Sequence, residues 1–154
     1  MITKKVKVLN YQKAEDKILD IISNSSNVLE DVVVFLYENF SHYSWVGIYI
    51  VEGNDLVLGP WEGPHTTEHT RIPIGQGICG SAAASGKTEA IPDVNADSRY
   101  LSCFVSTKSE IVVPIKKDKK IIGGIDIDSD KKDAFTEEDI VFLEKIADML
   151  SKHI

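Results

Sequence analysis

The chain has 154 residues, which fits one domain with a single core that needs no disulfide to fold. Its 43% hydrophobic and 27% charged residues are typical of a globular protein and exclude a disordered chain. The formal net charge of -7 argues against nucleic acid and membrane surfaces as partners, because both bind basic patches, so we expect a small ligand.

The first half of the chain predicts two helices and a β-hairpin. Apolar residues recur at helical spacing over residues 11–25 and again over residues 27–40, so these two segments are expected to pair as a helical hairpin. Residues 45–51 and 56–61 are rich in β-branched and aromatic residues and flank a loop of turn residues, which is typical of a β-hairpin. The polar segment 62–69 follows, and it is long enough to cover a site.

A glycine-rich segment stands at the centre of the chain. After a short strand over residues 70–74, the segment from Gly75 to Gly80 leads into a short helix over residues 81–85 that ends at Gly86. The segment matches the dinucleotide fingerprint G-x-G-x-x-G, but that fingerprint needs a longer crossover helix, so we reject it. The glycines instead let the backbone approach a ligand closely.

The second half predicts three more strands and a terminal helix. The strands cover residues 87–91, 111–115 and 121–127, and the helix begins after Thr136, which has the features of an N-cap. Neighbouring strands that are joined by tight turns indicate an antiparallel sheet. We therefore expect an α+β fold with helices packed on that sheet.

The two cysteines, Cys79 and Cys103, leave three interpretations open. With neither a membrane-spanning run nor a signal peptide we expect a cytoplasmic protein, where a structural disulfide is not expected. The two thiols can then be inert and buried, they can bind a metal, or they can be redox-active. Metal binding is disfavoured because the sequence has no C-x-x-C motif and no histidine at ligand spacing from either cysteine. Polar neighbours favour an accessible Cys103, and a helix start favours a thiolate at Cys79, for which a packing role stays open.

Three carboxylates follow the cysteines, namely Glu110, Asp126 and Asp128. Alternate residues of a strand share one face, so Asp126 and Asp128 are expected to project together. Two adjacent carboxylates raise the pKa of at least one of them, which can then hold a proton near neutral pH. A solvated outer face of the sheet is the alternative interpretation for each acid.

Short motifs with specific residues cover nearly the whole chain. They include Trp45-Val-Gly-Ile-Tyr49, Leu58-Gly-Pro60, Arg71-Ile-Pro-Ile-Gly-Gln-Gly-Ile-Cys-Gly80, Ile91-Pro-Asp-Val94, Ser109-Glu-Ile-Val-Val-Pro114, Ile122-Gly-Gly-Ile-Asp-Ile-Asp-Ser129 and Phe135-Thr-Glu-Glu-Asp139. Together they resemble the single-domain GAF proteins that are free methionine-(R)-sulfoxide reductases. The resemblance implies one GAF domain over residues 1–154, with a central antiparallel sheet flanked by N-terminal and C-terminal helices.

The resemblance also implies roles for individual residues. Cys103 matches the catalytic thiol, and Cys79 matches one of the family's other cysteines. The carboxylates that contact the substrate match Glu110, Asp126 and Asp128, and the aromatic residues that line the pocket match Trp45 and Tyr49. Many members carry a further cysteine where this chain has His69, so the resolving role would pass to Cys79.

The implied reaction is reduction of free methionine sulfoxide without a cofactor or a metal. The Cys103 thiolate attacks the sulfoxide sulfur while an acid protonates the oxygen, which leaves methionine and a sulfenic acid on Cys103. Cys79 then forms a disulfide that a thioredoxin-like partner reduces. A homodimer is compatible with this interpretation. The alternative function is a non-catalytic GAF sensory domain that binds a small ligand.

Overall fold

A computed structural model describes residues 10–101, 104 and 106–154 of the chain. In this part the helices and strands follow the order α1 (Tyr11–Asn24), α2 (Val28–Asn39), β1 (Trp45–Glu52), β2 (Asp55–Glu62), β3 (Arg71–Pro73), α3 (Gly77–Ser85), β4 (Glu89–Ile91), η1 (Val94–Ala96), β5 (Ser109–Lys117), β6 (Lys120–Ser129), α4 (Glu137–Leu150) and η2 (Ser151–His153). None of the helices in the described part is long and apolar enough to span a membrane.

The strands form one six-stranded sheet in the order β3-β2-β1-β6-β5-β4. Every neighbouring pair is antiparallel, so the predicted α+β class is confirmed. The two hairpins β1–β2 and β5–β6 are local in sequence. Strands β1 and β6 are far apart in the chain, and their pairing joins the two hairpins into one sheet.

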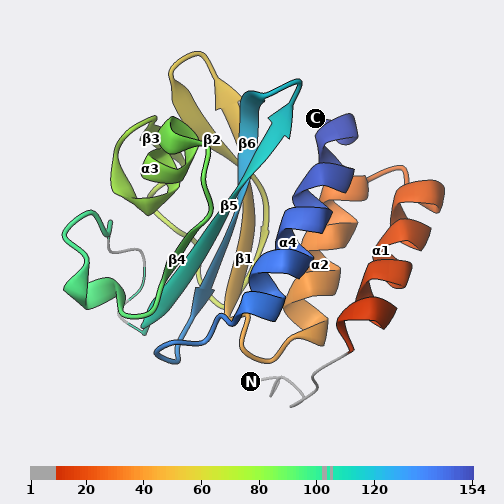
Figure 1. Cartoon of the computed structure of the whole chain (residues 1–154), viewed down its shortest axis with the longest axis horizontal. Helices are drawn as coiled ribbons and strands as arrows, with labels where there is room; N and C mark the ends of the chain where they lie inside the picture. The colour runs from red at the N-terminus through yellow and green to blue at the C-terminus, as the bar shows by residue number, and fades with distance from the viewer. Residues whose placement is uncertain (1–9, 102–103, 105) are drawn as a thin grey trace.

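The two faces of the sheet are covered by different helices. Helices α2 and α4 pack on one face with α1 on their outer side, and the short helix α3 lies on the other face (Figure 1). The larger core, on the first face, includes the strand residues Val46, Ile48, Ile111, Val113, Ile115, Ile125 and Ile127. Because side chains alternate along a strand, the residues between them point toward α3.

Helix α3 begins earlier than the sequence predicted. It starts at Gly77 rather than at residue 81, so Cys79 lies inside its first turn. A Cβ atom on Gly80 would lie 2.7 Å from the carbonyl oxygen of Pro73, which explains why the helix passes so close to the preceding strand. Its end at Gly86, with a left-handed φ of 70°, is as predicted.

The N-terminus of α4 is fixed by Asp139, which lies in the first turn of the helix. Its carboxylate accepts the backbone N–H of the N-cap residue Thr136 at 2.9 Å. It also accepts the hydroxyls of Tyr11 at 2.9 Å and Tyr43 at 2.7 Å and contacts Nε2 of His42 at 2.9 Å. We call these five residues the Asp139 network. The network joins α1, the loop after α2 and α4 on the face remote from α3.

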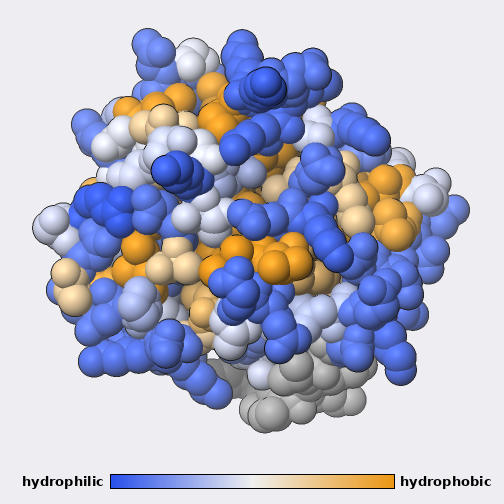
Figure 2. Space-filling view, viewed as in Figure 1, coloured by the Kyte–Doolittle hydropathy of each residue, from blue (hydrophilic) through white to orange (hydrophobic). Residues whose placement is uncertain are grey.

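The surface seen in Figure 2 is mostly hydrophilic, with small and separate apolar areas. Among the described residues, the exposed large hydrophobic side chains are Leu19 and Val141. Isolated apolar residues of this kind are normal on a protein surface.

Candidate active site

The three predicted acids meet on the sheet face beneath α3. Trp45 on β1 lies opposite Asp128 on β6, and Asp128 lies opposite Glu110 on β5. One step along the same face, Gly47 lies opposite Asp126. The acids are 6% (Glu110), 4% (Asp126) and 3% (Asp128) exposed, so the alternative of a solvated outer face is wrong. We call Glu110, Asp126 and Asp128 the acid cluster.

Helix α3 places the thiol of Cys79 against this cluster. The Cys79 sulfur, a Glu110 oxygen and an Asp126 oxygen all lie within 4.8 Å of one another. Cys79 is a free cysteine and is 6% exposed. The sequence placed these residues in one region, but only the packing of α3 on the sheet brings the sulfur to the carboxylates.

Burial raises the pKa of both aspartates above the ordinary value. For Asp128 the increase is large, and the charge of neighbouring Asp126 adds to it. For Asp126, hydrogen bonds with Glu110 and with the Cys79 thiol act against the effect of burial. A hydrogen bond between two carboxyl groups needs a proton on one of them. The raised pKa of both aspartates has the direction that the prediction for two adjacent acids requires.

The same surroundings raise the pKa of Cys79 well above the ordinary value. Burial is the largest cause, and the charges of Asp126 and Glu110 follow. The prediction that a helix start favours a thiolate at Cys79 is therefore wrong. The helix dipole is a small effect beside desolvation and adjacent negative charges, so Cys79 is a protonated thiol at neutral pH.

Three buried polar atoms in this region have no hydrogen-bond partner among the described residues. They are Oδ1 of Asp126, Oδ1 of Asp128 and Nε1 of Trp45. An unpaired buried polar atom costs free energy, and in native proteins it commonly marks a place where a ligand or water binds. Two unused acceptors beside one unused donor suit a small polar ligand that carries positive charge.

The ring of Trp45 forms a wall beside these atoms. A Cβ atom on Gly47 or on Gly63 would lie 2.4 Å from the indole, so both glycines make room for the ring. Trp61 stacks on Trp45 at a centroid distance of 6.1 Å, and Phe104 lies 5.8 Å away. A cavity of about 60 Å³ opens here, lined by Ser44, Trp45, Pro64, His65, Phe104, Ser106, Thr107, Asp128 and Asp130.

Known proteins resemble this chain over most of its length. Residues 24–154 match the GAF domain family. The chain is 37% identical to the free methionine-R-sulfoxide reductase of Escherichia coli over 124 residues, which are 80% of this chain and 74% of that protein. The chain belongs to the GAF-domain family of free methionine-R-sulfoxide reductases. The predicted GAF-like architecture and the resemblance that the motifs carry are confirmed.

Two solved structures share the fold over almost the full length of this GAF domain. The fRMsr of Staphylococcus aureus in its reduced form is 35% identical with a TM-score of 0.87, and the match covers 97% of this chain and 98% of that one. The free methionine-R-sulfoxide reductase from Neisseria meningitidis, in complex with its substrate, is 32% identical with a TM-score of 0.87. That match covers 97% of this chain and 95% of the Neisseria chain.

Two further residues with predicted roles at the site, Tyr49 and Cys103, differ in what the structure describes of them. Tyr49 is 2% exposed and packs in the smaller core with Cys79, and its hydroxyl donates to the carbonyl of His69 at 2.7 Å. Cys103 lies outside the described residues, so its approach to Cys79 stays a prediction. The described residues Leu101 and Phe104 pack, respectively, in the smaller core beneath α3 and against Trp45.

Sequence reasoning missed Trp61, His65 and Phe104 as neighbours of the acid cluster. Trp61 and Phe104 both contact Trp45, and His65 lies 6.3 Å from Phe104 between ring centroids. The signal that could have found them is the long polar segment 62–69, which was expected to cover a site. That signal covers His65 alone, because Trp61 belongs to β2 and Phe104 to the loop before β5, and their approach to Trp45 depends on the tertiary fold.

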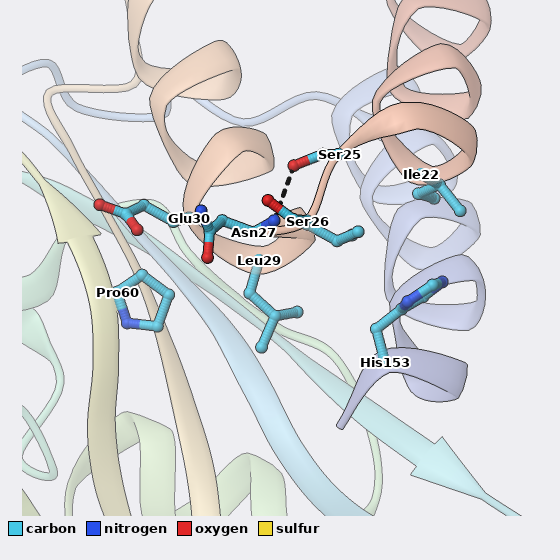
Figure 3. Close-up of a pocket in the computed structure, with 9 residues that line it drawn as sticks. Ile22, Ser25, Ser26, Asn27, Leu29, Glu30, Pro60 and His153 are labelled. Carbon is cyan, nitrogen blue, oxygen red and sulfur yellow. Dashed lines mark hydrogen bonds between the residues drawn. The ribbon is translucent and has the colours of Figure 1, made fainter.

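A larger hollow, of about 670 Å³, lies elsewhere on the GAF domain (Figure 3). It is lined by the α1–α2 connection, by Pro60 of β2 and by His153 of η2. Glu30 is the one carboxylate among the residues that line this hollow, and none of these lining residues is a cysteine. With neither paired acids nor a thiol, this hollow lacks the groups that the reductase chemistry needs, so we assign the candidate site to the acid cluster.

Proposed function

We propose that this GAF domain reduces free methionine-(R)-sulfoxide to methionine, with Cys103 as the nucleophile. The observation that carries the proposal is the buried acid cluster against Cys79 and Trp45, in a chain related to free methionine-R-sulfoxide reductases. Buried carboxylates with unused oxygens suit a substrate that brings its own ammonium group. A methionine inside a peptide has no such group, so the site favours the free amino acid.

The roles of the site residues follow from their surroundings. Oδ1 of Asp126 and Oδ1 of Asp128 are available to accept the substrate ammonium or to hold the proton that the reaction consumes. The flat ring of Trp45, supported by Trp61, is suited to pack against the apolar part of methionine sulfoxide. Glu110 lies opposite Asp128 in the sheet, and one of its oxygens lies within 4.8 Å of an Asp126 oxygen, so we assign it the role of sharing a proton with the aspartates.

In the first step the Cys103 thiolate attacks the sulfoxide sulfur, and the sulfoxide oxygen takes a proton from the acid cluster. The methionine sulfur–oxygen bond breaks as the hydroxyl passes to the Cys103 sulfur. Methionine leaves, and Cys103 becomes a sulfenic acid, so the sulfoxide is reduced by two electrons and the thiol is oxidised by two. The raised pKa of Asp128 suits the proton donor, because a group protonated at neutral pH is required.

In the second step the Cys79 thiol attacks the Cys103 sulfenic acid, which forms a disulfide and releases water. A thioredoxin-type dithiol then reduces the disulfide. Because Cys79 is a protonated thiol, its proton must leave during this attack, and the Asp126 carboxylate is the adjacent acceptor. The Cys79→Ser variant is expected to release about one equivalent of methionine per chain and then stall with thioredoxin, while small thiols still support turnover.

The proposal is tested by measuring methionine formation from each sulfoxide epimer with dithiothreitol. We expect turnover of the free R epimer only, and none by Cys103→Ser, since a hydroxyl cannot replace a thiolate nucleophile. Circular dichroism of that variant controls for its fold. A parent chain that binds methionine sulfoxide but forms no methionine would instead support the alternative, a GAF sensory domain.

A further inference from the structure

One sulfur and two oxygen donors converge beneath α3 in a geometry that suits a metal ion. The Cys79 sulfur, a Glu110 oxygen and an Asp126 oxygen lie within 4.8 Å of one another, and all three residues are buried. They belong to three different elements, α3, β5 and β6, so spacing in the sequence could not reveal them. We propose that the reduced protein binds one zinc-like divalent cation through Cys79, Glu110 and Asp126.

The distances are compatible with coordination after a small contraction. Zinc binds thiolate sulfur at about 2.3 Å and carboxylate oxygen at about 2.1 Å, so donors around a tetrahedral ion lie about 3.5 Å apart. The present separations reach 4.8 Å at most. We expect rotation of the carboxylate side chains, above all of the longer Glu110, to close this difference.

A second observation also points to a cation at this place. Asp126 is 4% exposed and Asp128 is 3% exposed, and each has an Oδ1 atom with no partner among the described residues. Buried carboxylates are stable when they are protonated, hydrogen-bonded or paired with positive charge. Asp128 lies opposite Glu110 in the sheet, so its unpaired Oδ1 atom belongs to the same group of buried acceptors as the three donors.

The donor types select the class of metal. A thiolate favours soft or borderline ions such as zinc over magnesium and calcium, which prefer oxygen alone. Three protein ligands leave a fourth position open, as in zinc sites that keep an exchangeable water. Binding replaces the Cys79 thiol proton with the metal and releases that proton to solvent, so affinity is expected to increase with pH.

Cobalt(II) is the direct probe, because it accepts the ligands of zinc and gives a charge-transfer absorption when a thiolate binds it. The full chain would carry Cys103→Ser, so that Cys79 is the one remaining thiol. Titration under reducing conditions is expected to give a thiolate–cobalt band that saturates at about one equivalent, and zinc should remove it. Saturation without such a band would overturn the proposal.

Matched variants identify the ligands. In the same background, Cys79→Ser should lose the band, and Glu110→Gln and Asp126→Asn should each weaken zinc binding at least about tenfold. Asp20→Asn changes an exposed carboxylate on α1 and should leave the affinity unchanged. Thermal melting of each variant confirms that it is folded. Zinc affinity that survives in both folded carboxylate variants would overturn the proposal.

An effect of zinc on methionine formation is also expected, and this expectation rests on the proposed function. If the acid cluster holds the substrate ammonium, zinc and methionine sulfoxide compete, and methionine formation should stop at one equivalent of zinc and return with a chelator. Because cobalt binding is measured without substrate, it does not depend on turnover. Zinc that binds through Cys79 but leaves turnover intact would contradict the proposed substrate position and not the metal site.

Discussion

The buried Asp139 of α4 and the buried acid cluster lie on opposite sides of the same sheet, and their carboxylates behave differently. Asp139 is 1% exposed, and its carboxylate is fully engaged by the hydroxyls and the amide of its network. Burial alone would raise the pKa of Asp139, but hydrogen bonds with His42, Thr136 and Tyr43 lower it to about 2. In the acid cluster, similar burial raises the pKa of Asp126 and Asp128.

Burial alone therefore does not decide the role of a carboxylate. The donors that surround Asp139 come from three parts of the chain. The Asp139 carboxylate is therefore fully hydrogen-bonded as an anion, and its hydrogen bonds hold α1 and α4 together. The acid cluster has more acceptors than donors, and its unused oxygens are available to a ligand. A buried acid with all its hydrogen bonds made stabilises the fold, and a buried acid with unpaired oxygens is available to bind a ligand.

The largest expected effect is on activity in the acid cluster. Asp126→Asn and Asp128→Asn are each expected to lower kcat/KM for methionine sulfoxide about a hundredfold or more, because each removes a proton donor or an anionic partner of the ammonium. Their free energy of unfolding at pH 7 should stay the same or increase, since folding must either bury the charge of a group of raised pKa or bind a proton to it, and an amide requires neither. Asp20→Asn is the matched surface control. Loss of stability with full activity would reverse the assignment of the two groups.

The opposite pattern is expected for Asp139→Asn. An amide cannot accept all the donors that surround the Asp139 carboxylate, which come from Tyr11, His42, Tyr43 and Thr136, so the free energy of unfolding should fall by about 3 kcal/mol. Activity per folded molecule should not change, because the network lies on the face remote from α3. Urea unfolding, together with kcat measured well below the melting temperature, tests both parts. A large loss of kcat in the folded variant would contradict the separation of the two faces.

Acid titration gives a smaller effect of defined sign. The folded pKa of Asp139 is about 2 and its ordinary value is 3.8, so its stabilisation is present above pH 4 and is lost as the pH falls toward 2. The difference of about two pKa units corresponds to about 2 kcal/mol. The stability gap between the parent and Asp139→Asn should therefore narrow by about that amount between pH 4 and pH 2. A gap that stays constant over this range would exclude ionised Asp139 as its source.

Local periodicity predicted much of the fold. A period of 3.6 residues predicted the helices, and a period of two predicted that Asp126 and Asp128 share a face, which the strand register confirms. The N-cap at Thr136 is also a local signal. These features depend on neighbours along the chain, so the sequence alone contains them.

Contacts between segments that are distant along the chain could not be predicted from sequence periodicity. The pairing of β1 with β6 places Trp45 opposite Asp128, and no periodicity predicts which strands become neighbours. The state of Cys79 was predicted wrongly for the same reason, because a local helix dipole was weighed without the carboxylates that the sheet brings beside it. The resemblance to a family supplied the residue roles that periodicity could not.

The smallest expected effect concerns Gly47, which lies opposite Asp126 in the sheet and directly against the Trp45 ring. A Cβ atom there would lie 2.4 Å from the Trp45 ring, so Gly47→Ala must displace the indole from its position beside Asp128. If Trp45 packs against bound methionine sulfoxide, KM should rise about tenfold, which corresponds to about 1.4 kcal/mol, with kcat less affected. Gly124→Ala is the matched control, since a Cβ on that glycine of β6 meets its neighbours at an ordinary 3.6 Å. Equal KM values for the two variants would show that the Trp45 ring does not contact the substrate, and the acid cluster alone would then account for binding.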